Sequence, residues 1–146
     1  MTTVHLPHLP VRCSSCAKIQ LVAAAGGAVP TCRGCGAQTA FLPGESYAEA
    51  DVSLFTRVEE AIAQQALTRR SAERIVAELH DGALRSEPPQ ALLLRVVDHL
   101  PSLHFLIPAL GLAPSRAPER AMMTRAVGMV RTIVAARLRD LESRLS

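Results

Sequence analysis

Four cysteines, the only ones in the chain, fall into two close pairs near the N-terminus. Cys13 and Cys16 enclose two residues, Cys32 and Cys35 enclose two residues, and fifteen residues separate the pairs. Two intervening residues make a tight turn that brings two sulfurs together and aims backbone N–H groups at them. Gly36, directly after the second pair, can adopt the positive φ that such a turn often needs. This spacing is typical of a site that holds one metal ion with four thiolates.

Zinc is the metal that this donor set favours. It takes four ligands at tetrahedral corners with Zn–S distances of about 2.3 Å, so neighbouring sulfurs lie about 3.8 Å apart. The same ligands accept iron, as in an electron carrier, and paired cysteines also occur as redox dithiols. We expect one structural zinc bound by Cys13, Cys16, Cys32 and Cys35, because two pairs in this register have zinc as their simplest explanation. Four protein sulfurs leave no open position for water, which argues against zinc catalysis.

Short strand signals surround the cysteine pairs. Residues 19–21 alternate as a strand does, Gly26-Gly27 is a turn signal, residues 28–29 would begin the return, and residues 37–42 would form a third strand. A segment of about 45 residues with so few large apolar side chains cannot hold itself together. We therefore expect the metal to supply much of its folding energy.

The first 44 residues resemble a zinc ribbon of the rubredoxin-like class, with two C-x2-C knuckles on facing turns. The resemblance rests on the four cysteines, Gly36 and the Gly-Gly turn. It implies a structural metal and a recognition surface, while function does not follow from the fold. Ala17 stands in the first knuckle where Gly36 stands in the second, so the two knuckles could differ in geometry.

Beyond a linker at residues 42–44, the sequence predicts an all-helical bundle of four to five helices over residues 45–146. The apolar residues follow helical spacing, and no run alternates convincingly as a strand. The first expected helix is opened by a Ser46/Glu49 capping box and carries Val52, Phe55, Val58 and Ile62, and a break follows at residues 68–71. A second helix is ended by Asp81-Gly82, and a third is capped by Ser86 with Pro88 in its first turn. A short helix over 102–110 precedes a long last helix that runs from Pro118 nearly to Ser146.

The charge distribution argues against a dedicated nucleic-acid binder. All 13 acidic residues lie at Glu45 or beyond with 13 of the 16 basic ones, so the helical domain is formally neutral. The first 44 residues carry Arg12, Lys18 and Arg33, and zinc with four thiolates lowers their net charge of +3 to about +1. Neither half has the basic excess that phosphate binding needs. These three cations are nevertheless the candidate nucleic-acid contacts of the ribbon.

The chain is expected to be cytoplasmic and free of membrane spans. Residues 1–10 lack a basic segment followed by an apolar one, as a secretory signal requires. The most apolar stretch, residues 91–113, contains charged residues and prolines that hydrocarbon would not tolerate. In a reducing cytoplasm, cysteine pairs are more often metal ligands than disulfides.

Histidines offer weaker candidate sites. His5 and His8 precede the ribbon and would be additional or replacement ligands, but the cysteines already satisfy a metal, so we expect a mobile or packing role near the knuckles. His99 and His104, near Asp98, are separated by Pro101 and need share no helical face, and such histidines usually satisfy a local hydrogen bond. The sequence contains no known catalytic motif, and we expect the protein not to be an enzyme.

The last helix offers a candidate surface for self-association, most simply as a homodimer. Its arginines (Arg116, Arg120, Arg125, Arg131, Arg137, Arg139 and Arg144) scatter around the helix, which favours solvated edges over a phosphate-binding stripe. One apolar row comprises Met123, Val127, Val130, Val134, Leu138, Leu141 and Leu145. A second comprises Met122, Met129, Ile133 and Ala136. Either one row meets a partner, or both are buried within the monomer.

Together these features predict a zinc-binding adaptor or regulatory protein that acts through protein contacts. The alternative is a transcription- or translation-associated nucleic-acid binder that uses the edge of the ribbon and the arginine-rich last helix.

Overall fold

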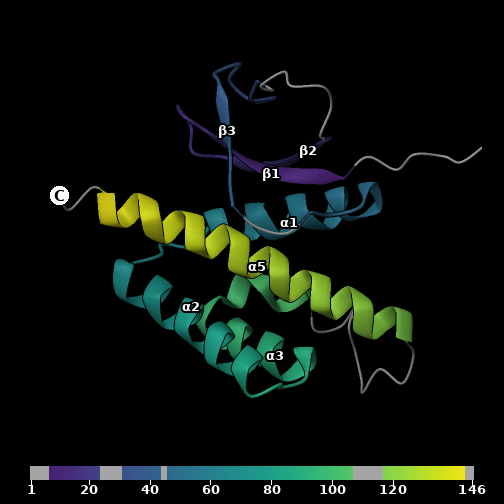
Figure 1. Ribbon diagram of the computed structural model, residues 1–146. Coiled ribbons are helices and arrows are strands. Elements are labelled where there is room, and N and C mark those ends of the chain that lie inside the picture. Colours follow the sequence, from purple (N-terminus) through teal and green to yellow (C-terminus); the bar gives the residue numbers. More distant parts are fainter. Residues whose placement is uncertain (1–6, 24–30, 44–45, 107–116, 144–146) are drawn as a thin grey trace, which may run out of the picture. The chain divides into compact units, whose positions relative to one another are not determined.

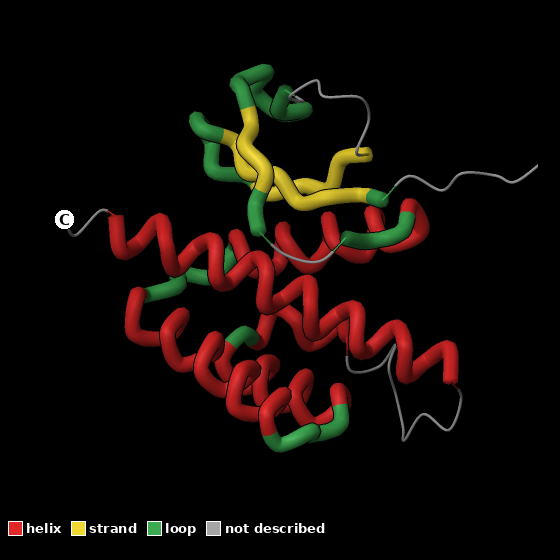
Figure 2. Tube along the Cα trace, in the orientation of Figure 1, coloured by secondary structure: helices red, strands yellow, loops and turns green. Residues whose placement is uncertain are grey.

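A computed structural model describes residues 7–23, 31–43, 46–106 and 117–143, the side chains of residues 117–120 excepted. The chain divides into two compact units, Met1–Glu59 and Glu60–Ser146. In the described residues a small antiparallel sheet comes first and four α-helices follow, as expected (Figures 1 and 2). The first unit extends past residue 44 to include the start of the first helix, α1.

Three strands form the sheet of the first unit (Figure 1). They are β1 (His8–Cys13), β2 (Ile19–Ala23) and β3 (Thr39–Phe41), in the order β2-β1-β3 with both pairings antiparallel. Strands β2 and β3 confirm the strands expected at 19–21 and 37–42, although β3 is shorter. The expected return strand at residues 28–29 lies outside the described residues.

The central strand β1 does not follow from the sequence pattern, because prolines at positions 7 and 10 disfavour a strand. Pro10 is tolerated because the ladder with β3 begins only at Val11, so its missing N–H falls beyond the end of that ladder. The carbonyl of Pro10 still accepts a hydrogen bond from the Leu42 N–H at 2.9 Å.

Tyr47 connects the sheet to the helical start of the same unit. It exchanges two backbone hydrogen bonds of 2.8 Å with His8, and its ring lies 5.7 Å from the ring of Phe55 in α1 (Val52–Ala63). Both aromatic residues are buried, together with Val11 and Ile19. The aromatic pair therefore extends the core of the first unit beyond the sheet.

The capping box expected at Ser46 and Glu49 is wrong. Residue 47 is in extended pairing with His8, so the helix cannot begin before it. A short 3-10 turn, η1 (Glu49–Asp51), precedes α1 instead, and the Asp51 carboxylate accepts from the Ala48 N–H at 3.3 Å. The acidic residue that closes this turn is two positions further along the chain than expected.

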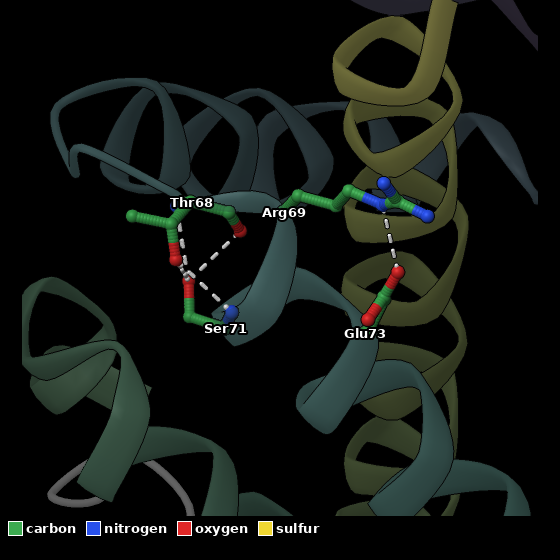
Figure 3. Close-up of polar contacts among 4 residues, drawn as sticks. All are labelled: Thr68, Arg69, Ser71 and Glu73. Carbon is green, nitrogen blue, oxygen red and sulfur yellow. Dashed lines mark hydrogen bonds and ion pairs between the residues drawn. The ribbon is translucent and has the colours of Figure 1, made fainter. Parts of the chain in front are cut away.

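The break expected at residues 68–71 is in fact the N-terminus of α2 (Arg69–Leu84). Thr68 is the N-cap: its hydroxyl accepts from the Ser71 N–H at 3.1 Å, and its own N–H donates to the Ser71 hydroxyl at 3.1 Å (Figure 3). Arg69 and Glu73 add an exposed ion pair of 3.0 Å on the same turn (Figure 3). Serine replaces the glutamate of a standard capping box, which is why the sequence pattern did not reveal the cap.

The end expected for α2 at Asp81-Gly82 is also wrong, since the helix continues to Leu84. Gly82 is buried inside the helix, where a Cβ would overlap the Cδ2 of Leu92. Ser86, expected as an N-cap, has a φ of 54° and reverses the chain after α2. Pro88 rather than Ser86 occupies the N-cap of α3 (Pro89–His99). Gly82 thus allows α2 and α3 to pack closely and does not end α2.

The remaining elements are a 3-10 helix, η2 (Pro101–Phe105), and the long α5 (Ala117–Ser143). Helix α2 packs on α3 and α5, and α3 packs on α5 and η2. Helix α5 confirms the long last helix. Of the short helix expected over 102–110, η2 covers the first part, and residues 107–116 lie outside the described residues.

Both apolar rows of α5 are mostly buried in the single chain. The buried members are Met123, Val127, Val130 and Val134 of the first row and Met129, Ile133 and Ala136 of the second. Leu138, Leu141 and Met122 are only half-buried, and residue 145 is not described. Self-association through α5 therefore stays a prediction, and among the described members of the two rows only Met122, Leu138 and Leu141 are exposed enough to meet a partner. No described helix has both the length and the apolar character of a membrane span.

Candidate metal centre

Two turns of matching backbone geometry present the four cysteines. The first knuckle follows the end of β1, and the Cys13 N–H donates to the Lys18 carbonyl at 2.9 Å. In the second knuckle the Cys32 N–H donates to the Ala37 carbonyl at 2.8 Å. Each bond joins the first cysteine of a pair to the residue five positions later, so both turns close in the same way.

Ser14 ties the first knuckle to the chain that leaves the second. Its N–H and its hydroxyl both donate to the Gln38 carbonyl, at 3.1 and 2.9 Å. Gln38 in turn forms a bridge with Thr31, which precedes Cys32. The acceptor of both hydrogen bonds is the backbone carbonyl of Gln38, which any residue would supply, so the sequence pattern does not predict them.

The four sulfurs gather at one point. All four Sγ atoms lie within 4.8 Å of one another, with Cys13 and Cys35 at 3.3 Å and Cys16 and Cys32 at 3.7 Å. A zinc tetrathiolate requires sulfur separations of about 3.8 Å, which this cluster meets with small adjustments. The cysteines are therefore positioned to hold one metal ion, as the spacing predicts.

Backbone N–H groups surround the two buried sulfurs. Those of Ser15 and Cys16 reach the Cys13 Sγ at 3.4 Å, and that of Gly34 reaches the Cys32 Sγ at 3.4 Å. Such donors stabilise thiolates, which are the form that binds metals.

The thiol pKa values move in opposite directions across the cluster. The Cys16 N–H, with the Ser15 N–H and neighbouring thiols, outweighs burial and lowers the pKa of Cys13 to about 6. The N–H groups of Cys35 and Gly34 lower the pKa of Cys32. The Ala37 N–H acts to lower the pKa of Cys35, but the Cys13 sulfur, burial and the other two sulfurs together raise it to about 11. Four thiolates so close together need a cation to neutralise them.

The sequence left open a difference in geometry between the knuckles, because alanine follows Cys16 whereas glycine follows Cys35. The backbone conformation at these two positions is nevertheless the same. Ala17 has a φ of 61° and Gly36 a φ of 75°, so both are left-handed. The turn forces alanine into a conformation that costs an L-residue about 1–2 kcal/mol. The first knuckle therefore holds strain that the second avoids.

Exchanging these two residue types tests that strain. We expect Gly36→Ala to lower the stability of the zinc-bound unit by about 1 kcal/mol, or about fivefold in zinc affinity, because nothing within 4 Å obstructs the added Cβ and only backbone strain is introduced. Ala17→Gly should raise affinity about two- to fivefold, since relief of strain exceeds the entropy cost of glycine. Competition with a zinc chelator measures the zinc affinity of both variants. Equal affinities would contradict the claim that the backbone at Ala17 is strained.

The histidines and Asp98 form no second centre in the part of the chain described here. His8 lies on β1 outside the sulfur cluster. His99 bonds through Nε2 to the Glu78 carboxylate at 3.0 Å, which joins α3 to α2. Asp98 and His104 are exposed. His99 thus has the local partner expected of such a histidine, and His5 lies outside the described residues.

The candidate nucleic-acid contacts lie beside the knuckles. Arg12 directly precedes the first ligand and Lys18 closes the same turn, and both are half-buried. Arg33 is exposed between the two ligands of the second knuckle. On α5, Arg125, Arg131 and Arg139 are exposed and Arg137 is half-buried, while the side chains of Arg116, Arg120 and Arg144 are not described.

Comparison with known proteins gave no match to a protein-family model, to a curated protein or to a solved structure.

Proposed function

We propose that this chain is a zinc-binding, non-enzymatic adaptor or regulatory protein of the cytoplasm, with a zinc ribbon that shapes a protein-binding surface. The gathering of four cysteine sulfurs within 4.8 Å carries the proposal. Cys13, Cys16, Cys32 and Cys35 would hold one zinc ion, which supplies folding energy on the order of 10 kcal/mol in comparable small modules. Four thiolates favour zinc over the harder cations that prefer oxygen.

A structural role suits this donor set better than a catalytic one. Catalytic zinc keeps one position for water or substrate, whereas four sulfurs fill all the positions of a tetrahedral ion. The knuckle backbone further commits its N–H groups to the sulfurs of Cys13 and Cys32. The first unit would therefore act by presenting a surface.

Phe41 supports a protein partner for that surface. It is 49% exposed on β3, an edge strand of the described sheet. It lies two residues beyond Thr39, which pairs with the ligand Cys13, so it is held near the metal centre. Aromatic side chains are enriched at protein interfaces, and an exposed edge strand can accept a further strand.

Charge weakens the nucleic-acid alternative, although the exposed Arg33 favours it. The compact first unit, residues 1–59, contains four basic and four acidic residues. One zinc ion with four thiolates adds two net negative charges, so the loaded unit carries a formal charge of about −2. A duplex would gain few released counterions from such a unit.

Nucleic-acid binding is accordingly expected to be weak and independent of sequence. Gel-shift titration of a random duplex at about 50 and 200 mM salt should give dissociation constants above the micromolar range at the higher salt. Submicromolar binding at physiological salt, weakened by Arg33→Ala, would instead establish the nucleic-acid binder.

An affinity pull-down with matched variants tests the adaptor directly. The protein should capture the same partner before and after nuclease treatment, and Phe41→Ala should lose it while Arg33→Ala retains it. Loss of the partner with nuclease, or with Arg33→Ala alone, would contradict the proposal. Sedimentation of the wild type would separately test self-association, since a monomer at high micromolar concentration excludes the dimer.

A further inference from the structure

The four ligands differ in their access to solvent. Cys16 and Cys35, the second cysteine of each knuckle, are exposed, whereas Cys13 and Cys32 are buried. Each exposed sulfur has a buried sulfur of the other knuckle close by. Cys35 lies 3.3 Å from Cys13, and Cys16 lies 3.7 Å from Cys32. The site therefore pairs a cysteine that is exposed to solvent with a buried one, twice, across the two knuckles.

We propose that the cysteine cluster is a peroxide-responsive switch, in which oxidation joins Cys35 to Cys13 across the knuckles and releases the metal. The proposal rests on the zinc site of the proposed function and adds its regulation. Cys35 is placed to react first because it is an exposed cysteine and its sulfur lies 3.3 Å from that of Cys13, closer than the 3.7 Å between Cys16 and Cys32.

The chemistry balances with a peroxide as the oxidant. In the metal-loaded site Cys35 is held as a thiolate. This thiolate attacks one oxygen of hydrogen peroxide, the O–O bond breaks, and a sulfenic acid and hydroxide form. The Cys13 thiolate then attacks the Cys35 sulfur, the S–O bond breaks, and a second hydroxide leaves as the disulfide forms. Two thiolates lose two electrons, and the peroxide accepts them.

The oxidised cluster retains only Cys16 and Cys32 as thiolates, too few for a stable zinc site. Release of the metal removes its contribution to the folding of the first unit. The new disulfide still joins the two knuckles, so a thiol reductant and zinc can rebuild the site. Oxidation would thereby control the surface that includes Phe41.

The backbone favours this pairing over a disulfide within one knuckle. Ser14 holds the first knuckle against Gln38 through two hydrogen bonds, which keeps the knuckles together while the first disulfide forms. Within each knuckle, the backbone N–H groups aimed at the first sulfur hold the turn in its ligand geometry. We therefore assign the disulfide to Cys13 and Cys35, one from each knuckle.

Mass spectrometry of the oxidised full-length protein tests the pairing. Trypsin separates peptide 13–18, which carries Cys13 and Cys16, from peptide 19–33 with Cys32 and peptide 34–57 with Cys35. After one equivalent of hydrogen peroxide, 13–18 should be linked to 34–57, and fragmentation between Ser14 and Ser15 should locate the bond on Cys13. A metallochromic dye should record one zinc released per peroxide consumed. A bond within 13–18, or one between 19–33 and 34–57, would overturn the proposal.

Alkylation of the zinc-loaded protein without oxidant tests the accessibility separately. Limited maleimide should label Cys16 and Cys35 several-fold faster than Cys13 and Cys32, with equal rates after denaturation as the control. Equal rates in the folded protein would contradict the proposal. Protein purified without zinc would count against the proposed function itself, whereas zinc that stays bound under stoichiometric peroxide would count against the switch alone.

Discussion

The Cys32→Ser variant is expected to lose its zinc and the order of residues 1–59 while keeping the helices of residues 60–146. Cys32 is 3% exposed and supplies one of four thiolates, and a serine hydroxyl is a poor replacement ligand. The described core of the first unit is small. Besides two of the cysteines, its buried large apolar residues are Val11, Ile19, Leu21, Val22, Tyr47, Phe55 and Val58. Loss of a contribution on the order of 10 kcal/mol should therefore unfold the unit. Elemental analysis would measure the loss of zinc, and circular dichroism would show that the helices remain. Faster proteolysis at Lys18 and Arg33 would show that residues 1–59 lose their order.

Ser15→Ala is the matched control for that variant. Residue 15 is exposed in the first knuckle and contributes its backbone N–H to the Cys13 sulfur, which alanine retains. It should hold one zinc and resist proteolysis as the wild type does. Tight binding of a full equivalent of zinc by Cys32→Ser would show that the ligands are misassigned. Collapse of both units in a single transition would show that they share one core.

The Gly82→Leu variant is expected to destabilise the second unit by about 2 kcal/mol. Even a Cβ at this position would overlap the Cδ2 of the buried Leu92 in α3, and it would lie 3.4 Å from the Cγ of the same leucine. Overpacking costs about 3 kcal/mol at its upper range, offset by about 1 kcal/mol because leucine favours a helix over glycine. In a unit of this size the midpoint of thermal unfolding should fall by about 10 °C.

Ala83→Leu is the control for the packing argument. Residue 83 follows Gly82 on α2 but is exposed, so the same side chain should change stability by less than about 0.5 kcal/mol. Thermal unfolding followed at the helical band compares the two variants directly. Equal midpoints would mean that α2 and α3 do not pack closely at Gly82.

The metal centre could be predicted from the sequence because its geometry is local. Two residues between cysteines fix the turn, and the backbone supplies the N–H groups that surround the sulfurs. The strain at Ala17 was less accessible, because a positive φ there is imposed by the turn and is not preferred by alanine. The bond from Ser14 to Gln38 was not predictable, since its acceptor is a backbone carbonyl that every residue carries.

Errors in the fold arose where tertiary contacts overrode local signals. The strand signals of the sequence do not include residues 8–13, where Pro10 disfavours a strand, yet pairing with β2 forms β1 there. Gly82 and Ser86 carried the usual signals of a helix end and a helix start, but the first sits inside α2 to make room for Leu92 and the second reverses the chain. The long periodic pattern of α5 was reliable because burial of several successive turns enforces it.

Metal content of the purified protein tests the central claim most directly. Native mass spectrometry of protein expressed and purified without added metal should show one zinc per chain. Denaturation in the presence of a chelator should then expose four free thiols. Iron at one equivalent would make the site an electron carrier instead. A metal-free chain with four free thiols, in a fully folded first unit, would contradict the claim that zinc holds this unit together.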